Sequence, residues 1–498
     1  MKSTYKLFIL TAAISFLQGC TKDFEKINTP PTSVTVIDPG LVFSKVQKDA
    51  AFAEGYEYPN NQFGSWIQQW AGGVLISSSR YVEQSDNDTW AAHYTLIRNI
   101  SQIRNEILKG MENDPAGRTK LAMAKIVEIT VWQRLTDLFG DVPYSQTGLG
   151  AEEVNSKPAF DTQESIYKSL IANINTAMGQ LNASDASYGA ADFYYKGDVA
   201  KWKKYANSIK LRLGMRIRYA DPALAQKTVT EAMAQPLMES NSDNATIPTY
   251  NNATNANVHP LLNHFLAGSP DLKYLADAFV TKLVTTNDPR LPRIAQPTVN
   301  SVKAGTPGYK GIGVALTDAL LKNVIKDDYS TASTLTFFNR SYSPAIPCIV
   351  MSFSDVSFYK AEAALEGWGA TVEQAEGFYQ AGVRAALAQE PYNITTVPAS
   401  FTELSFTGLT KEQKLEKIGT QKWIQLFGRS YEAFTEWRRM GYPALKPGPF
   451  AGSTNGTIPR RTIYSSREAL LNAENYKAAS ARMSNGDTYV SKVWWDKR

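Results

Sequence analysis

The sequence predicts a mainly α-helical (all-α) fold of helical hairpins, with long irregular insertions and a few short strands. Apolar residues recur with the 3.6-residue period of an amphipathic helix, most clearly between Leu121 and Leu138. The predicted helices come in pairs joined by Gly or Pro turns, as where Gly367 ends one helix and Thr371 caps the next. Strand signals are few and short. These three observations indicate a scaffold of paired helices.

The helices are expected wherever the apolar period persists along the chain. Asp161 and Glu164 form a capping-box-like start for a helix that carries Tyr167, Leu170 and Ile174 on one face. Further helices are predicted at about 84–109, 121–138, 199–219, 272–285, 355–366, 371–389, 411–427 and 430–440. The hairpins are tetratricopeptide-like in spacing, although no clean tandem repeat is present.

Long insertions rich in Asn, Gly, Pro, Ser and Thr interrupt this helical pattern. They fall at about 182–198, 240–271, 286–347 and 441–465. Loops longer than about 15 residues are uncommon inside a compact body and tend to carry function. We therefore expect ligand specificity to lie in these insertions.

The composition excludes several classes of protein. The chain has 498 residues, of which 43% are hydrophobic and 20% charged, so it is no disordered scaffold. Only 2 cysteines are present, which excludes a disulfide framework. The net charge is +5, from 52 basic and 47 acidic residues, and so small a basic excess argues against nucleic acid as a partner.

The N-terminus has the form of a bacterial lipoprotein signal. Lys2 and Lys6 precede an apolar run over 7–17, which is too short to span a bilayer because about 20 apolar residues are needed. The run ends in Leu-Gln-Gly-Cys20, which resembles the lipobox, where lipid is attached to the cysteine sulfur before cleavage. The alternative is that Cys20 is an ordinary residue beyond an ordinary signal peptide.

This interpretation divides the chain into three parts. Residues 1–19 are predicted to be a signal peptide, 20–40 a lipidated, proline-containing tether, and 41–498 a single helical body. Cleavage removes two lysines and lowers the net charge to +3 (5 − 2). The other cysteine, Cys348, lies in an apolar stretch and is expected to be a buried, inert thiol.

Several segments, taken in order, resemble the SusD/RagB family of Bacteroidetes lipoproteins. They are Trp132–Ser145, Phe160-Asp161, Ile166-Tyr167, Gly197-Asp198, Lys201–Leu213, Asn287–Leu291, Tyr359–Ala364, Gly367-Trp368, Gln421–Phe427 and Glu436–Pro443. The resemblance extends from Cys20 to about residue 443. Its signature residues Asp137, Asp141 and Asn207 are interpreted as fold residues rather than ligand contacts.

The resemblance implies a function as well as a fold. Family members are anchored by lipid in the outer leaflet of the outer membrane, facing the cell exterior. They cap a SusC-like TonB-dependent β-barrel transporter and hand it oligosaccharides, other glycan fragments or peptides. They are binding proteins without catalysis, so no enzyme activity and no cofactor are expected. Two alternatives remain open: a lipid-anchored surface hydrolase, and a structural lid of the transporter that binds no ligand.

Aromatic and amide side chains are the candidates for ligand binding, because sugar C–H faces pack on aromatic rings while amides bind hydroxyl groups. The residues singled out are Tyr81, Trp66, Trp70, Trp90, Asn87 and Tyr309. Tyr81 lies in a polar stretch and is the leading candidate. Trp66 and Trp70 are spaced i, i+4, which suits a core stripe equally well, and Tyr309 lies in an insertion that is also typical of a solvated loop.

Sequence signals for metal and cofactor chemistry are weak. The three histidines, His93, His259 and His264, lack the i, i+4 spacing of a helical zinc pair, so no metal site is predicted. The sequence has no Walker A motif and no Gly-x-Ser-x-Gly elbow. The most basic stretch, Lys201–Arg218, alternates with apolar residues and is interpreted as an amphipathic helix.

Overall fold

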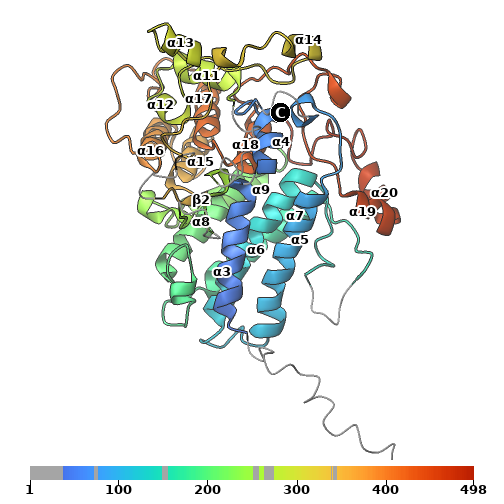
Figure 1. The fold of residues 1–498 in the computed structure, drawn as a ribbon. Coiled ribbons are helices and arrows are strands. Elements are labelled where there is room, and N and C mark those ends of the chain that lie inside the picture. The colour runs from blue at the N-terminus through green and yellow to red at the C-terminus, as the bar shows by residue number, and fades with distance from the viewer. Residues whose placement is uncertain are drawn as a thin grey trace, which may run out of the picture. The chain divides into compact units, whose positions relative to one another are not determined.

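Pairs of long helices from the first half of the chain lie side by side in the lower part of the body (Figure 1). The computed structural model describes residues 37–55, 57–71, 77–148, 155–250, 257–262, 274–337, 339 and 345–498. Residues 40–498 form one compact unit. Neighbouring pairs such as α5 with α6, α6 with α7, α7 with α8 and α8 with α9 pack directly on one another. These helices are α3 (Pro39–Gly55), α4 (Glu57–Trp66), α5 (Asn87–Gln102), α6 (Arg118–Phe139), α7 (Gln163–Gln180), α8 (Val199–Arg216) and α9 (Pro222–Met233).

The second half of the chain adds a second group of helices and the longest irregular segments. Helix α15 packs on α16 and α17, and α18 packs on both α17 and α4, which ties the two ends of the chain together. These elements are α11 (Asp277–Thr285), α12 (Leu291–Ile294), α13 (Val299–Lys303), α14 (Asp318–Leu321), α15 (Phe353–Leu365), α16 (Ala375–Ala388), α17 (Lys411–Gln425), α18 (Ser430–Met440), α19 (Ser466–Leu471) and α20 (Ala473–Ala481). The predicted mainly α fold of hairpins and long insertions is confirmed.

Strands contribute little among the described residues. The antiparallel pair β1 (Ala245–Ile247) and β2 (Cys348–Met351) joins two insertions across about a hundred residues of sequence, with Ile247 opposite Cys348. The Cys348 thiol is buried, as expected from its apolar neighbours. No described helix is both long and apolar enough to cross a membrane.

Capping residues explain where the helices begin, with one correction. Thr371 is a cap as expected and forms a capping box with Gln374, and Ser352 with Asp355 forms another at the start of α15. Helix α7, however, is capped by Thr162 and not by Asp161. The Asp161 carboxylate instead accepts hydrogen bonds from the backbone N–H groups of residues 144 and 145, at 3.0 and 2.8 Å. The sequence alone cannot show that this carboxylate is already engaged.

Two large buried clusters form most of the core, and a small third one contains Ala71, Tyr274 and Ile312. The larger one runs through α3 to α9 and continues into α18, and the smaller one lies between α15, α16 and α17. Helix α9 was not predicted, because its buried face consists of the small residues Ala225, Thr228, Val229 and Ala232, which give a weak apolar period. Its start is nevertheless well marked by Pro222 in the first turn and by the Asp221 cap.

Candidate functional site

Two of the candidate aromatic residues, Trp66 and Trp70, lie entirely in the core. Both side chains have 0% exposure. Trp66 packs edge-on against Tyr489, with ring centroids 4.9 Å apart, and Trp70 stacks on Phe427 at 4.7 Å. Of the two roles that the i, i+4 spacing allows, the structure shows core packing for both tryptophans. Neither ring has a face that is accessible to a sugar.

Tyr81, the leading candidate from its polar sequence surroundings, is buried in the structure. Its side chain has 0% exposure, and its backbone carbonyl accepts a hydrogen bond from Ser453 N at 3.0 Å. The segment around Gly452 approaches so closely that a Cβ there would meet the Tyr81 carbonyl oxygen at 2.8 Å. Trp90 is buried as well, with its ring edge-on to Phe139 at 5.0 Å.

The other candidates differ in position. Asn87 is exposed, and its side-chain oxygen accepts hydrogen bonds from Ser465 Oγ at 2.7 Å and from Ser466 N at 3.0 Å. Asn87 thus fixes the start of α19 to the start of α5. Tyr309 is half-buried in a loop whose neighbour Gly308 accepts a hydrogen bond from Thr298 N at 2.9 Å. Cys20 lies outside the described residues.

A pocket forms where four segments, distant in sequence, converge. They are 259–261, 346–349, 389–392 and 425–429, which border β2 and the C-terminal ends of α16 and α17. The volume of the pocket that the centre of a water-sized sphere can occupy is about 40 Å³. By the same measure, a cavity that holds one water has about 10–15 Å³. Half-buried residues at its rim, including Phe337 and Pro347, connect it to solvent. It has room for a small chemical group.

Two glutamine side chains in this pocket carry buried acceptors without partners. Gln389 is 7% exposed and Gln425 is 3% exposed, and neither Oε1 has a hydrogen-bond partner among the described residues. The Gln425 amide is oriented by its Nε2, which donates to Ser352 Oγ at 3.2 Å. A buried acceptor without a donor is costly, so such atoms in a pocket mark a place where a ligand or water completes the structure.

Among the described residues, no cationic side chain in the pocket is free to bind a ligand. Burial lowers the pKa of His259 to about 4, so its imidazole is neutral at physiological pH. Its Nδ1 accepts a hydrogen bond from Leu261 N at 3.3 Å. The Arg429 guanidinium donates to Asp355 Oδ2 and to the Val350 carbonyl, both at 2.9 Å. The pocket therefore suits a neutral group better than an anion.

Sequence reasoning missed these pocket residues. His259 was considered only as a metal ligand, and Gln425 only as part of a family signature. Gln389 lies at the end of a helix and has no motif around it. No local pattern could have identified the pocket, because it exists only where the four segments meet.

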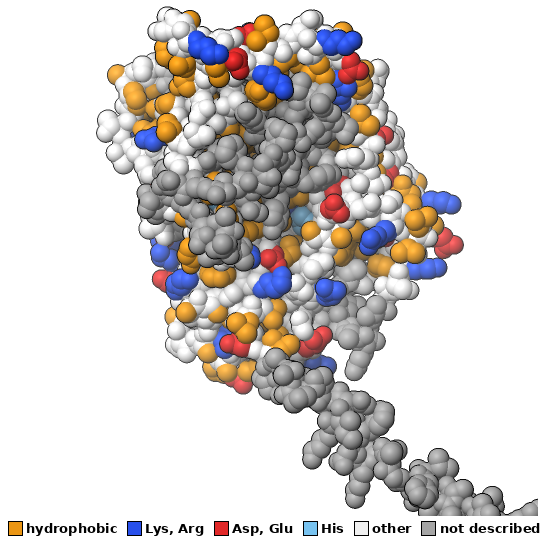
Figure 2. All heavy atoms as spheres, viewed as in Figure 1, with side chains coloured by type: hydrophobic (Ala, Val, Ile, Leu, Met, Phe, Trp, Pro, Cys, Tyr) orange, Lys and Arg blue, Asp and Glu red, His pale blue; other side chains and the backbone are white. Residues whose placement is uncertain are grey.

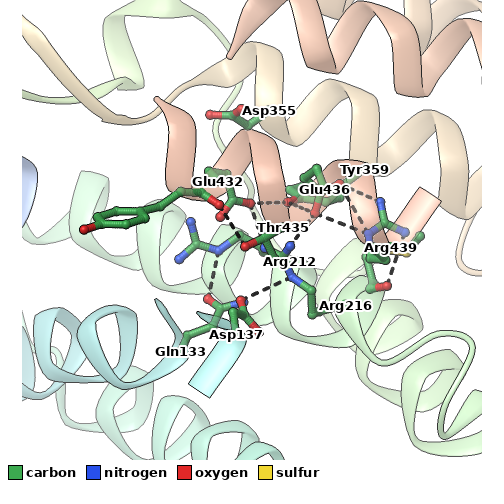
Figure 3. Close-up of polar contacts among 12 residues, drawn as sticks. Gln133, Asp137, Arg212, Arg216, Asp355, Tyr359, Glu432, Thr435, Glu436 and Arg439 are labelled. Atoms are coloured by element: carbon green, nitrogen blue, oxygen red, sulfur yellow. Dashed lines mark hydrogen bonds and ion pairs between the residues drawn. The ribbon is translucent and has the colours of Figure 1, made fainter. Parts of the chain in front are cut away.

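A second group of polar residues lies deeper, between α6, α8, α15 and α18 (Figure 3). Arg216 donates to Glu432 at 2.7 Å and forms an ion pair with Glu436 at 2.9 Å, while Arg439 donates to Glu436 at 2.7 Å. Tyr359 Oη donates to both glutamates at 3.0 Å. These carboxylates are buried and paired with arginines, so we interpret the network as structural: its ion pairs and hydrogen bonds hold α6, α8, α15 and α18 together.

Asp137 gives this buried network a pH dependence. Burial outweighs the attraction of Arg216 and raises the Asp137 pKa to about 6, above its unfolded value near 4. The folded state therefore binds the extra proton in this window, and the free energy of unfolding falls as pH rises through it. We expect wild type to lose about 2 kcal/mol between pH 4 and 7 relative to Asp137→Asn, measured by urea unfolding at each pH. Parallel pH curves for the two proteins would contradict this.

Comparison with known structures places the fold. A chitin-binding protein is 30% identical to this chain, with a TM-score of 0.79, and the match covers 93% of this chain and 100% of that one. A chitin-binding SusD homologue from Flavobacterium johnsoniae is 23% identical, with a TM-score of 0.74 over 92% and 99% of the two chains. A SusD-like protein described as Bacteroidetes AC2a is 22% identical, with a TM-score of 0.76 over 93% and 100%. The last two likenesses show the fold alone.

Comparison with curated proteins and family models completes the assignment. The extracellular matrix-binding protein EbhA of Staphylococcus aureus is 26% identical over 204 residues, or 37% of this chain. This chain spans only 3% of the length of that relative. By contrast, the family model described as "Starch-binding associating with outer membrane" matches residues 31–465. With that match over most of its length, the chain belongs to the SusD-like family of starch-binding proteins that associate with the outer membrane.

Proposed function

We propose that this protein is a lipid-anchored, surface-exposed lipoprotein that binds oligosaccharides and delivers them to a SusC-like TonB-dependent β-barrel transporter. The observation that carries the proposal is the family match over residues 31–465, supported by 30% identity to a chitin-binding protein along nearly the whole chain. Figure 2 shows lysines and arginines interspersed with acidic residues over the described atoms of one face. A neutral ligand such as a glycan meets no field of a single sign there.

Delivery requires a partner, and its test is direct. We expect a β-barrel transporter to co-purify with the protein in mild detergent, and deletion of the protein to slow import of the oligosaccharide. Normal import after deletion, with no barrel in the purified material, would remove the transport role. Import that fails while the isolated protein binds no oligosaccharide would instead favour the structural lid.

Membrane attachment is expected to depend on Cys20. A Cys20→Ala chain has no sulfur to receive lipid, so it should be lost from the outer-membrane fraction in a strain that lacks the partner transporter. Cell fractionation followed by immunoblotting measures this. The matched control is Cys348→Ala, which removes the buried thiol. This variant should remain in the membrane fraction. A Cys20→Ala protein that still fractionates with the outer membrane would rule out lipid anchoring.

Tyr309 is the remaining aromatic candidate with an accessible ring, and we place the aromatic contact to the ligand there. Its loop is held by hydrogen bonds, so the ring is in place before binding. We expect Tyr309→Ala to weaken oligosaccharide binding about three- to tenfold in calorimetry, as removal of a stacking ring does. Tyr476→Ala, at a half-buried tyrosine of α20, is the control and should bind normally. Equal affinity of both variants and wild type would exclude Tyr309 from the site.

A further inference from the structure

We propose that the pocket between β2 and the ends of α16 and α17 binds the N-acetyl group of an N-acetylated sugar. The inference rests on the proposed glycan binding and specifies the class of glycan. It follows from the two unpaired glutamine oxygens, the apolar walls and the lack of a free cation among the described lining residues, taken together.

The two glutamine oxygens require donors. Gln389 Oε1 and Gln425 Oε1 are buried and lack partners among the described residues, so each amide must turn toward the pocket for a ligand donor to reach its oxygen. An N-acetylated hexosamine presents an amide N–H next to a ring hydroxyl, so one sugar unit offers two donors on adjacent carbons. A glucose unit has hydroxyl donors at the same positions but no methyl group, whereas the acetamido group has both an N–H donor and a methyl group.

The walls of the pocket suit a methyl group. Leu261, Phe337, Ile346, Pro347 and Phe427 contribute apolar side chains. Phe427 and Ile346 are 4% and 5% exposed, while Phe337 and Pro347 stand half-buried at the rim. Burial of an acetyl methyl against such walls is favourable, whereas burial of a hydroxyl without a partner is not.

Charge in and around the pocket argues against anionic ligands. His259 is neutral, and Arg429 is already engaged by Asp355 and the Val350 carbonyl, so an acidic sugar finds no counter-ion there. Glu390 is half-buried on the pocket wall and is the group that would attract a free amino sugar. Acetylated and deacetylated forms of the same oligosaccharide therefore distinguish the glutamine oxygens from this carboxylate.

The test compares three tetrasaccharides by calorimetry with the full lipidated chain in detergent: N-acetylated chitotetraose, its fully deacetylated form and cellotetraose. We expect wild type to prefer the acetylated sugar about tenfold, and Gln389→Leu to reduce that preference to about threefold or less. Gln380→Leu is the matched control. It lies on α16 outside the pocket, where Gln380 bonds to Glu376 and to the Leu404 carbonyl, and it should keep the preference.

A stability measurement separates binding from a structural role. Because Gln389→Leu removes an acceptor that has no donor, its melting temperature should equal or exceed that of wild type. As a second readout without any variant, saturation-transfer NMR on wild type should show the acetyl methyl receiving more saturation than the ring protons.

Each other outcome overturns the inference in a recognisable way. Equal affinity for the acetylated sugar and cellotetraose would leave glycan binding intact and remove the acetyl pocket. Tighter binding of the deacetylated sugar would assign recognition to Glu390. A preference that survives in Gln389→Leu would place the acetyl site elsewhere. If none of the three sugars binds, both the acetyl pocket and binding of chitin-type sugars are excluded. Titration with starch-type oligosaccharides then tests the proposed function separately.

Discussion

Glu362→Gln is expected to lower the free energy of unfolding by about 3 kcal/mol, because it removes the carboxylate that Arg439 and Arg218 share and leaves each arginine with one other carboxylate partner, Glu436 and Glu366 respectively. The Glu362 carboxylate is 0% exposed and accepts from Arg439 Nη2 at 2.7 Å and from Arg218 Nη1 at 2.5 Å. Burial opposes ionisation of Glu362, yet the attraction of Arg439 and Arg218 outweighs it and lowers its pKa to about 2. The carboxylate is therefore charged in the folded protein at neutral pH.

The pH dependence of this stabilisation follows from the sign of the shift. Because the folded pKa lies below the unfolded value of about 4.5, the contribution is complete at neutral pH. It is lost as pH falls from about 4.5 towards 2. Wild type and Glu362→Gln should accordingly converge in stability under acid conditions.

Urea unfolding followed by circular dichroism measures the Glu362 effect. The matched control is Glu164→Gln, which breaks an exposed i, i+4 pair with Lys168 and should leave the unfolding midpoint nearly unchanged. A loss in Glu362→Gln no larger than that of the control would show that the buried charges do not hold α15, α18 and the segment after α8 together.

Trp70→Ala is expected to cost about 3–5 kcal/mol of stability without removing any direct contact to the oligosaccharide. The ring is fully buried and stacks on Phe427, which itself stacks on Phe279 at 5.2 Å. Removing it leaves a large cavity between α4, α11 and the end of α17. Trp66→Ala should behave alike, because that ring packs on Phe63, Phe434 and Tyr489.

The measurement pairs thermal unfolding with calorimetry at a temperature where the variant remains folded. Tyr309→Ala provides the opposite pattern as a control, with a smaller loss of stability, because its ring is only half-buried, and a reduced affinity. Weakened binding by folded Trp70→Ala, with normal stability, would restore this tryptophan to the ligand site.

Local signals allowed the helical scaffold to be predicted from the sequence. Helix α18 was expected at 430–440 and spans Ser430–Met440, and Thr371 caps its helix as predicted. Such features depend on residues three or four positions apart, which a sequence displays directly. Helices α9 and α3 (Pro39–Gly55) were missed altogether, because their apolar residues give weaker helical periods.

The binding residues could not be predicted with the same success. Whether a candidate side chain is exposed depends on segments that are distant in the sequence. The polar sequence around Tyr81 suggests an exposed loop, but residues 452 and 453 fold over it from some 370 positions away. Trp66 and Trp70 illustrate a related limit, since i, i+4 spacing is the same for a core stripe and for a binding platform. Gln389 and Gln425 gain meaning only from the pocket that surrounds both.

The most direct test of the account is calorimetric titration of the full lipidated chain with malto- and chito-oligosaccharides, followed by mass spectrometry of the recovered sugar. We expect saturable binding of at least one of these sugars and recovery of the sugar uncut. Absence of binding to both classes would contradict glycan capture, and shortened sugar products would show a surface hydrolase instead.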